Sequence, residues 1–234
     1  MWMLTASGHD YHFSGPKSLG ANARPVLIED IAHHLGQCNR YNGATIRPCS
    51  VAEHSLLCAD IAKHAGFSVI VQWAALMHDA HEFVTGDMSS PIKQIVNGYS
   101  MAAGGVEAWG LFEDEHERVV HKKFGMLTIF RSHEKVVKEI DNQALATERR
   151  DLTRFDPLRN LPWPHLDAPG NEVPPIQWID LNTPEREAMT WRDWRDAFLS
   201  RFIELRNACE IDFKKLLARD EKLHALANAA RMVL

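Results

Sequence analysis

The residues best suited to chemistry lie in one stretch, residues 73–93, which reads WAALMHDAHEFVTGDMSSPIK. Its first half has apolar residues at helical spacing, and the middle of this predicted helix carries four polar residues, His78, Asp79, His81 and Glu82. A partly buried carboxylate needs a partner that offsets its lost hydration, and a cation is the simplest such partner. The stretch therefore predicts a cation site.

The spacing within this stretch predicts how its side chains share the site. In a continuous helix, His78 and Glu82 lie one turn apart and project from the same side, while Asp79 lies about 100° around the axis. A ligand and a nearby base can then serve one site. We expect the helix to end at Gly86, which places Asp87 in a turn beside the cation.

Two further polar residues stand on other predicted helices. Ser50 and Glu53 have the spacing of a capping box, which puts His54 in the first turn of the helix that follows. Asp141 falls on the apolar face of the helix predicted from residue 132 onward, where a carboxylate requires compensation. Each is more often a structural side chain when it stands alone. The His-Asp pair shifts that balance, because metal sites in helical folds recruit ligands from several facing helices.

Length and composition limit what the chain can be. Its 234 residues can form one sizeable core, and a composition of 45% hydrophobic and 24% charged residues is ordinary for a globular protein. The net charge of −5 argues against nucleic acid as a partner. The four cysteines form no C-x-x-C pair, which favours a reducing compartment. With no leader pattern and no bilayer-length apolar run, we expect a cytoplasmic protein that binds no membrane.

The pattern along the chain predicts one all-α domain with appendages. Residues 1–27 are rich in turn formers and predict a small irregular or β-hairpin segment that covers the core, which spans residues 28–150. Residues 151–184 are dense in proline and predict a long ordered loop. Residues 185–234 predict a C-terminal helical extension packed on the core. Its apolar stripe indicates either core or a dimer seam and consists of Trp194, Phe198, Phe202, Leu205 and Phe213.

The order of these motifs resembles the HD-domain phosphohydrolases, in which a histidine, a later His-Asp pair and a last aspartate lie on successive helices. The local sequences are similar to the bacterial 5′-deoxynucleotidase branch and to related phage deoxynucleotide phosphohydrolases. The matching segments are NRY at 39–41, VAEHS at 51–55 and HDAHEFVTGDMSSPIK at 78–93. The resemblance covers about residues 28–150 and implies an HD-domain helical bundle.

Carried over residue by residue, the resemblance implies a single divalent metal held by His54, His78, Asp79 and Asp141. Two neutral imidazoles and two carboxylates nearly balance the charge of a dication and leave positions open for water and a phosphate oxygen. A mixed nitrogen and oxygen set suits Co²⁺, Mn²⁺, Ni²⁺, Fe²⁺ or Zn²⁺ better than Mg²⁺.

The resemblance also implies roles around the metal. Glu82 matches the acid and base residue that activates the attacking water, and Asp87 matches a residue near the sugar or the leaving oxygen. Arg40 and Tyr41 match the N-R-aromatic turn that frames phosphate and nucleoside. Lys93 is a further candidate for phosphate binding. Surface or packing roles are the alternatives for Arg40, Tyr41 and Lys93.

The function implied by the resemblance is hydrolysis of the 5′-phosphate of deoxynucleoside monophosphates by an enzyme that is a homodimer. Tyr41 stands where the nucleotidase branch commonly has Trp, and the chain is longer at both ends, which leaves the substrate open. The alternatives are a triphosphohydrolase or pyrophosphohydrolase acting on dNTPs, a (p)ppGpp hydrolase, and a non-catalytic nucleotide-binding protein on the same fold.

Overall fold

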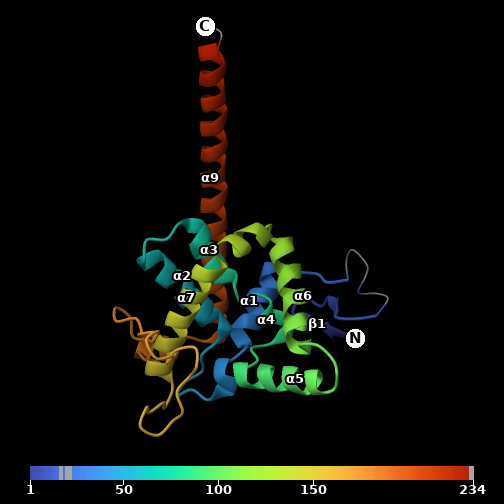
Figure 1. The fold of residues 1–234 in the computed structure, drawn as a ribbon, viewed down its shortest axis with the longest axis vertical. Helices are drawn as coiled ribbons and strands as arrows, with labels where there is room; N and C mark the ends of the chain where they lie inside the picture. Colours follow the sequence, from blue (N-terminus) through green and yellow to red (C-terminus); the bar gives the residue numbers. More distant parts are fainter. Residues whose placement is uncertain (16–17, 19–22, 232–234) are drawn as a thin grey trace.

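The computed structural model describes residues 1–15, 18 and 23–231, with side chains as far as residue 212. It is mostly helical, with one small antiparallel sheet (Figure 1). The elements are β1 (Trp2–Leu4), β2 (Asp10–His12), α1 (Ile28–Gln37), η2 (Arg40–Gly43), α2 (Val51–His64), α3 (Val69–Met77), α4 (Glu82–Thr85), α5 (Ser90–Ala102), α6 (Ala108–Lys123), α7 (Leu127–Leu152), α8 (Pro184–Ala188) and α9 (Trp191–Arg231).

Helix α2 is the central helix and begins where the sequence predicts. The Ser50 hydroxyl accepts a hydrogen bond from the Glu53 backbone N–H at 3.1 Å, which satisfies one of the free donors of the first turn. Gly66, with φ of +76°, follows the end of the helix and adopts the left-handed conformation that favours glycine. Helices α1, α3, α7 and α9 all pack against α2, so residues in its first turn are buried.

The predicted C-terminal stripe forms part of the core of this same chain. Trp194, Phe198, Phe202 and Leu205 of α9 are buried against α1 and α3, where they contact the cluster around Leu35. Full burial of each such side chain stabilises the fold by about 1.5–3 kcal/mol. The stripe therefore covers the helices that carry the candidate site. The last predicted member, Phe213, lies outside the described side chains.

The helix predicted through His78 to Glu82 is wrong in one respect. Helix α3 ends at Met77, and α4 begins only at Glu82. Between them the Ala80 N–H bonds to the Met77 carbonyl and the Glu82 N–H to the Asp79 carbonyl, which are i→i+3 bonds of a tighter turn. Polar contacts of His78 and Asp79 with α2 and α7 hold this turn, and they outweigh the local preference for a continuous helix.

Two other helix boundaries differ between the sequence-based prediction and the structure. Residues 97–110 contain four glycines, a composition that predicts a loop, but the chain is helical as far as Ala102, so residues 103–107 connect α5 to α6. Helix α7 begins at Leu127 rather than at residue 132. The N-terminal segment does form a hairpin, with Met3 paired to Tyr11, and no helix or strand is assigned within residues 153–183.

Two findings concern the whole described chain. No helix within the described residues is long and apolar enough to cross a membrane. All four cysteines lie in the described part and are free thiols.

Candidate metal centre

The imidazole of His54 lies in the first turn of α2 and is fully buried. Its Nδ1 atom is 2.8 Å from Glu148 Oε1 on α7, so the neutral ring donates a hydrogen bond from Nδ1 to the carboxylate. A histidine that binds metal through one nitrogen usually donates from the other in this way. The bond leaves the Nε2 lone pair of His54 available.

His78 directly follows α3, and its imidazole carries its proton on the same nitrogen as that of His54. Its Nδ1 atom is 2.8 Å from the Ala75 carbonyl oxygen, which only accepts hydrogen bonds, so Nδ1 carries the proton. Its Nε2 atom lies 3.3 Å from Nε2 of His54. Two nitrogen lone pairs at this distance repel each other unless a proton or a cation lies between them. The two rings are therefore arranged as a pair of metal ligands.

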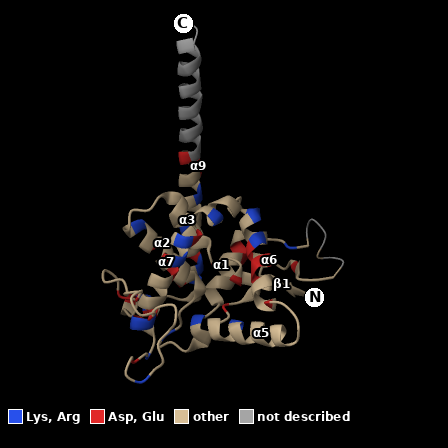
Figure 2. Ribbon diagram, in the orientation of Figure 1, with Lys and Arg blue, Asp and Glu red and all other residues tan. Residues whose placement is uncertain are grey.

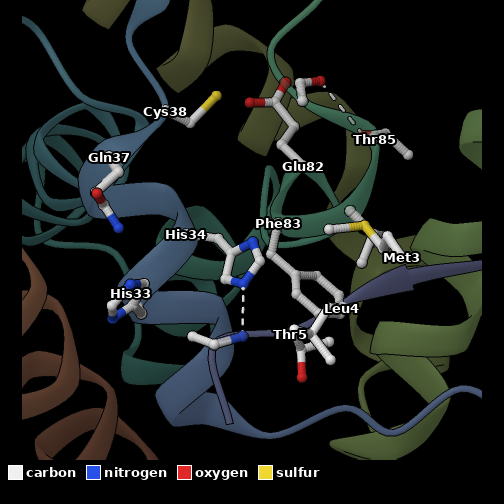
Figure 3. Close-up of a pocket in the computed structure, with 13 residues that line it drawn as sticks. Met3, Leu4, Thr5, His33, His34, Gln37, Cys38, Glu82, Phe83 and Thr85 are labelled. Carbon is white, nitrogen blue, oxygen red and sulfur yellow. Dashed lines mark hydrogen bonds between the residues drawn. The ribbon is translucent and has the colours of Figure 1, made fainter. Parts of the chain in front are cut away.

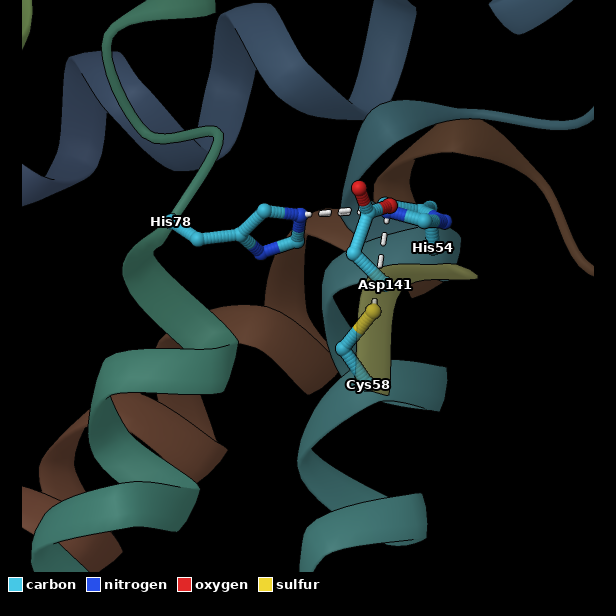
Figure 4. A group of neighbouring side chains, drawn as sticks. All are labelled: His54, Cys58, His78 and Asp141. Atoms are coloured by element: carbon cyan, nitrogen blue, oxygen red, sulfur yellow. Dashed lines mark hydrogen bonds and ion pairs between the residues drawn. The ribbon is translucent and has the colours of Figure 1, made fainter. Parts of the chain in front are cut away.

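Two carboxylates complete the group that the sequence predicts. Asp141 Oδ1 on α7 is 3.2 Å from His54 Nε2 and 3.7 Å from His78 Nε2. Asp79 Oδ2 is 3.2 Å from His78 Nε2 and 3.5 Å from His54 Nε2. Figure 4 shows the imidazole of His54 on α2, that of His78 just beyond the end of α3, and the carboxylate of Asp141 close to both. Each carboxylate thus lies beside the imidazole pair, but the group whose ligand atoms all lie within 4.8 Å of one another includes Asp141 and not Asp79.

The pKa values of His78 and Asp141 indicate which groups of the centre bind protons when no metal is bound. Burial alone lowers the pKa of His78, but Asp79 and Asp141 outweigh it and hold that pKa well above its usual value. Burial raises the pKa of Asp141, but His54 and His78 outweigh it and bring the net pKa well below its usual value. The imidazoles and carboxylates therefore share protons that a dication would displace.

A thiol that the sequence analysis missed lies in the same group. Cys58 is buried one helical turn after His54 on α2, and its Sγ is 3.6 Å from His54 Nε2. Ligand atoms of His54, Cys58, His78 and Asp141 all lie within 4.8 Å of one another (Figure 4). The four-residue spacing between the histidine and the cysteine is the sequence signal that could have found it.

The predicted phosphate-binding turn is joined to this centre through Glu148. Glu148 Oε2 accepts a hydrogen bond from Arg40 Nε at 3.0 Å and one from the Tyr41 hydroxyl at 2.6 Å. Arg40 also places its Nη1 3.6 Å from Asp79 Oδ2. Tyr41 has a φ of +58°, an uncommon left-handed conformation for a non-glycine residue. One buried carboxylate thus links His54 to both residues of the turn.

Glu82 stands between two cavities. The larger, of about 550 Å³, lies between α1, α4 and β1; Figure 3 shows Glu82 and Cys38 on one side of it and Leu4 and Thr5 on the opposite side. The smaller, of about 190 Å³, is lined by both Glu82 and Asp79. Glu82 Oε2 is buried and has no hydrogen-bond partner among the described residues. Burial, followed by the nearby Asp79 and Asp87 carboxylates, raises the pKa of Glu82 well above its usual value.

The remaining predicted residues lie around these cavities. Lys93 Nζ forms an ion pair with Glu113 Oε1 at 2.7 Å, and both residues line the smaller cavity. Acidic residues gather on α6 at this place (Figure 2). Asp87 donates its backbone N–H to Cys38 Sγ at 3.4 Å, and burial raises the pKa of its carboxyl. Neither Lys93 nor Asp87 is in contact with the imidazole pair in the structure as described.

The sequence was compared with family models and with curated proteins. No family model matches it. The uncharacterized protein YfdR of Escherichia coli is 30% identical over 173 residues, which are 74% of this chain and 83% of YfdR. An uncharacterized protein of Rhodobacter capsulatus is 35% identical over 159 residues, 66% of this chain and 74% of that protein. The chain belongs to the YfdR family.

In this YfdR-family chain, the described arrangement supports specific chemistry. Two imidazoles with available lone pairs and two carboxylates form a donor set for a divalent transition metal. Glu82, whose buried Oε2 has no hydrogen-bond partner in the described part of the chain, lines the smaller cavity together with Asp79. Arg40 supplies fixed positive charge beside Asp79. The cluster could therefore bind a metal ion, and it lies beside a fixed positive charge and a buried carboxyl group.

Proposed function

We propose that the chain is an HD-domain, metal-dependent phosphohydrolase that removes the 5′-phosphate of deoxynucleoside monophosphates. The observation that supports this proposal best is the convergence of His54 Nε2 and His78 Nε2 at 3.3 Å, with Asp79 and Asp141 oxygens within 3.7 Å of them. The proposal adopts the resemblance of the sequence motifs to the 5′-deoxynucleotidase branch.

The donor set fits the metal that the proposal requires. His54, His78, Asp79 and Asp141 would hold the ion, because their hydrogen bonds leave the two Nε2 lone pairs available. A bound divalent metal supplies Lewis-acid catalysis, which activates water and polarises phosphate.

The other roles belong to side chains of the chain itself. Glu82 accepts the proton of the attacking water, because its carboxylate adjoins the centre and its Oε2 has no partner in the described structure. Arg40 offsets the negative charge of the phosphate, and Glu148 holds the guanidinium in place. The cavity of about 550 Å³ beside Glu82 lies within the usual size range for small-molecule sites and would take the nucleoside.

The test is a substrate panel with metal-loaded protein. Phosphate release is measured on the four dNMPs, on dNTPs and on ppGpp with Mn²⁺ or Co²⁺ present, and the products are identified by mass spectrometry. We expect release from dNMPs, and its loss in His78→Ala. Release of triphosphate or pyrophosphate from dNTPs would replace the monophosphate assignment. If the protein binds metal and nucleotide without turnover on any substrate, the non-catalytic alternative holds.

A further inference from the structure

The proposed function leaves one side chain of the centre unused. The Cys58 thiol is completely buried and lies 3.6 Å from His54 Nε2, on the same helix and one turn away (Figure 4). Cys49 provides a comparison, because it is nearly as buried and packs in the same hydrophobic cluster. The thiol of Cys49 belongs to no group of metal-ligand atoms found in the described residues, whereas that of Cys58 does.

Three separations within the group, all measured from His54 Nε2, match the edges of a tetrahedral metal site. With zinc bonds of about 2.0–2.1 Å to nitrogen or oxygen and about 2.3 Å to sulfur, tetrahedral edges are about 3.3 Å between nitrogen or oxygen atoms and about 3.6 Å between nitrogen and sulfur. The structure has 3.3 Å between the two Nε2 atoms, 3.2 Å from His54 Nε2 to Asp141 Oδ1, and 3.6 Å from His54 Nε2 to Cys58 Sγ.

An octahedral site for a hard cation fits this group less well. Adjacent ligands at about 2.1 Å in an octahedron are only about 3.0 Å apart, shorter than these three separations. The separation of 3.7 Å between His78 Nε2 and Asp141 Oδ1 departs in the same direction. Sulfur is also a soft donor, which suits Zn²⁺, Co²⁺ or Fe²⁺ and not Mg²⁺.

We propose that Cys58 is a thiolate ligand of the metal centre and selects a thiophilic dication over Mg²⁺ and Mn²⁺. On binding, the S–H bond breaks, the proton passes to solvent and a sulfur–metal bond forms, with no change in oxidation state. Asp79 would remain beside the ion, because its Oδ2 lies 3.2 Å from His78 Nε2. The inference rests on the proposed metal centre, but it does not require turnover.

The test uses the colour of Co²⁺ bound to the full-length protein. Metal-free protein is titrated with Co²⁺, and we expect a near-ultraviolet sulfur-to-cobalt charge-transfer band that saturates with the visible cobalt bands. Cys58→Ser and Cys58→Ala should bind Co²⁺ without the charge-transfer band. In competition experiments they should lose at least about tenfold in Zn²⁺ affinity relative to Mn²⁺. Cys49→Ser is the matched control and should keep both the band and the preference.

The outcomes separate this inference from the proposed function. If wild-type protein binds Co²⁺ without a charge-transfer band, Cys58 is not a ligand, and this result needs no variant that folds. An unchanged preference for Zn²⁺ in both Cys58 variants, with native helical circular dichroism, would also overturn the inference. A sulfur band without phosphate release leaves the inference standing and refutes the phosphohydrolase proposal. Phosphate release without the sulfur band overturns the inference about Cys58 and leaves the phosphohydrolase proposal standing.

Discussion

Glu148 connects parts of the site that lie far apart in the sequence. Its two oxygens hold His54 Nδ1 at 2.8 Å, Arg40 Nε at 3.0 Å and the Tyr41 hydroxyl at 2.6 Å. Burial raises the pKa of Glu148, but Arg40 and His54 outweigh it and lower that pKa to about 2. The carboxylate therefore stays charged and keeps the His54 ring in the orientation that directs Nε2 toward His78 and Asp141.

We expect Glu148→Gln to lower metal affinity by about 10–100-fold, because the amide is uncharged and orients His54 and Arg40 less strongly. Metal dissociation constants from competition with a chelating dye measure this effect. Glu139→Gln is the control, because Glu139 is an exposed residue on the same helix whose nearest ion-pair partner, Lys135, lies 4.0 Å away. Equal affinities in the two variants would show that Glu148 has only a packing role.

Glu82 differs from the ligands because its loss should leave the metal in place. We expect Glu82→Gln to reduce kcat on the best substrate by about 10²–10⁴-fold, since the amide cannot accept the proton of water. The metal content of the purified variant should equal that of the wild type. The two measurements are kcat and metal per chain. Loss of metal together with activity would instead make Glu82 a ligand.

At the scale of elements, a network of charges holds the start of α2, and with it His54. Arg47 donates two hydrogen bonds to the buried Glu53 carboxylate, at 2.9 Å and 2.7 Å, and Arg186 of α8 donates a third at 2.7 Å. The sequence predicts Glu53 as part of a capping box, and the Ser50 half of that box is present. The Glu53 side chain instead bonds to Arg47 and Arg186, which no local pattern can show.

Glu53→Gln should destabilise the fold by about 3–5 kcal/mol, because it leaves the buried guanidinium of Arg47 without its counter-charge. Urea unfolding followed by circular dichroism gives the free energy of unfolding. The control is Lys135→Ala, which removes a partner of an exposed ion pair and should change stability by less than about 0.5 kcal/mol. A similar small change in Glu53→Gln would mean that water replaces the lost contacts.

The parts of the site that the sequence predicted are those with local signals. The cap at Ser50 fixed the place of His54 in its first turn, and the apolar face of α7 identified Asp141 as a carboxylate directed inward. The break between α3 and α4 was not predictable, because contacts from His78 and Asp79 to α2 and α7 hold it. Cys58 was missed because it reads locally as one more apolar position, although its four-residue spacing from His54 places both side chains on one side of α2.

At the scale of the whole molecule, the N-terminal hairpin is joined to the helices by a buried hydrogen bond. The Tyr11 hydroxyl of β2 lies 2.9 Å from His116 Nδ1 of α6, and both side chains are fully buried. Burial, followed by the charge of Arg24, lowers the pKa of His116 to about 4. The folded protein therefore keeps this histidine neutral, whereas the unfolded chain protonates it at a pKa of about 6.5.

The sign of the pH effect follows from these two values. Between about pH 6.5 and 4 the unfolded chain binds more protons than the folded one, so the contribution of His116 to stability is present above this window and is lost as the pH falls through it. Glu117 acts in the opposite direction, because burial, followed by the charge of Asp114, raises its pKa to about 7. A variant that differs only at His116 separates the two effects.

We therefore expect the difference in unfolding free energy between wild type and His116→Gln to change with pH. The glutamine keeps a hydrogen-bonding group for Tyr11 but does not titrate, so the contribution of Glu117 cancels in the difference. From about pH 7.5 down to about pH 4, wild type should lose on the order of 3 kcal/mol relative to the variant. Urea unfolding at several pH values in this range provides the measurement. Parallel stability curves would mean that His116 becomes protonated in the folded protein as readily as in the unfolded chain, and the hairpin would then depend on some other contact for its attachment to α6.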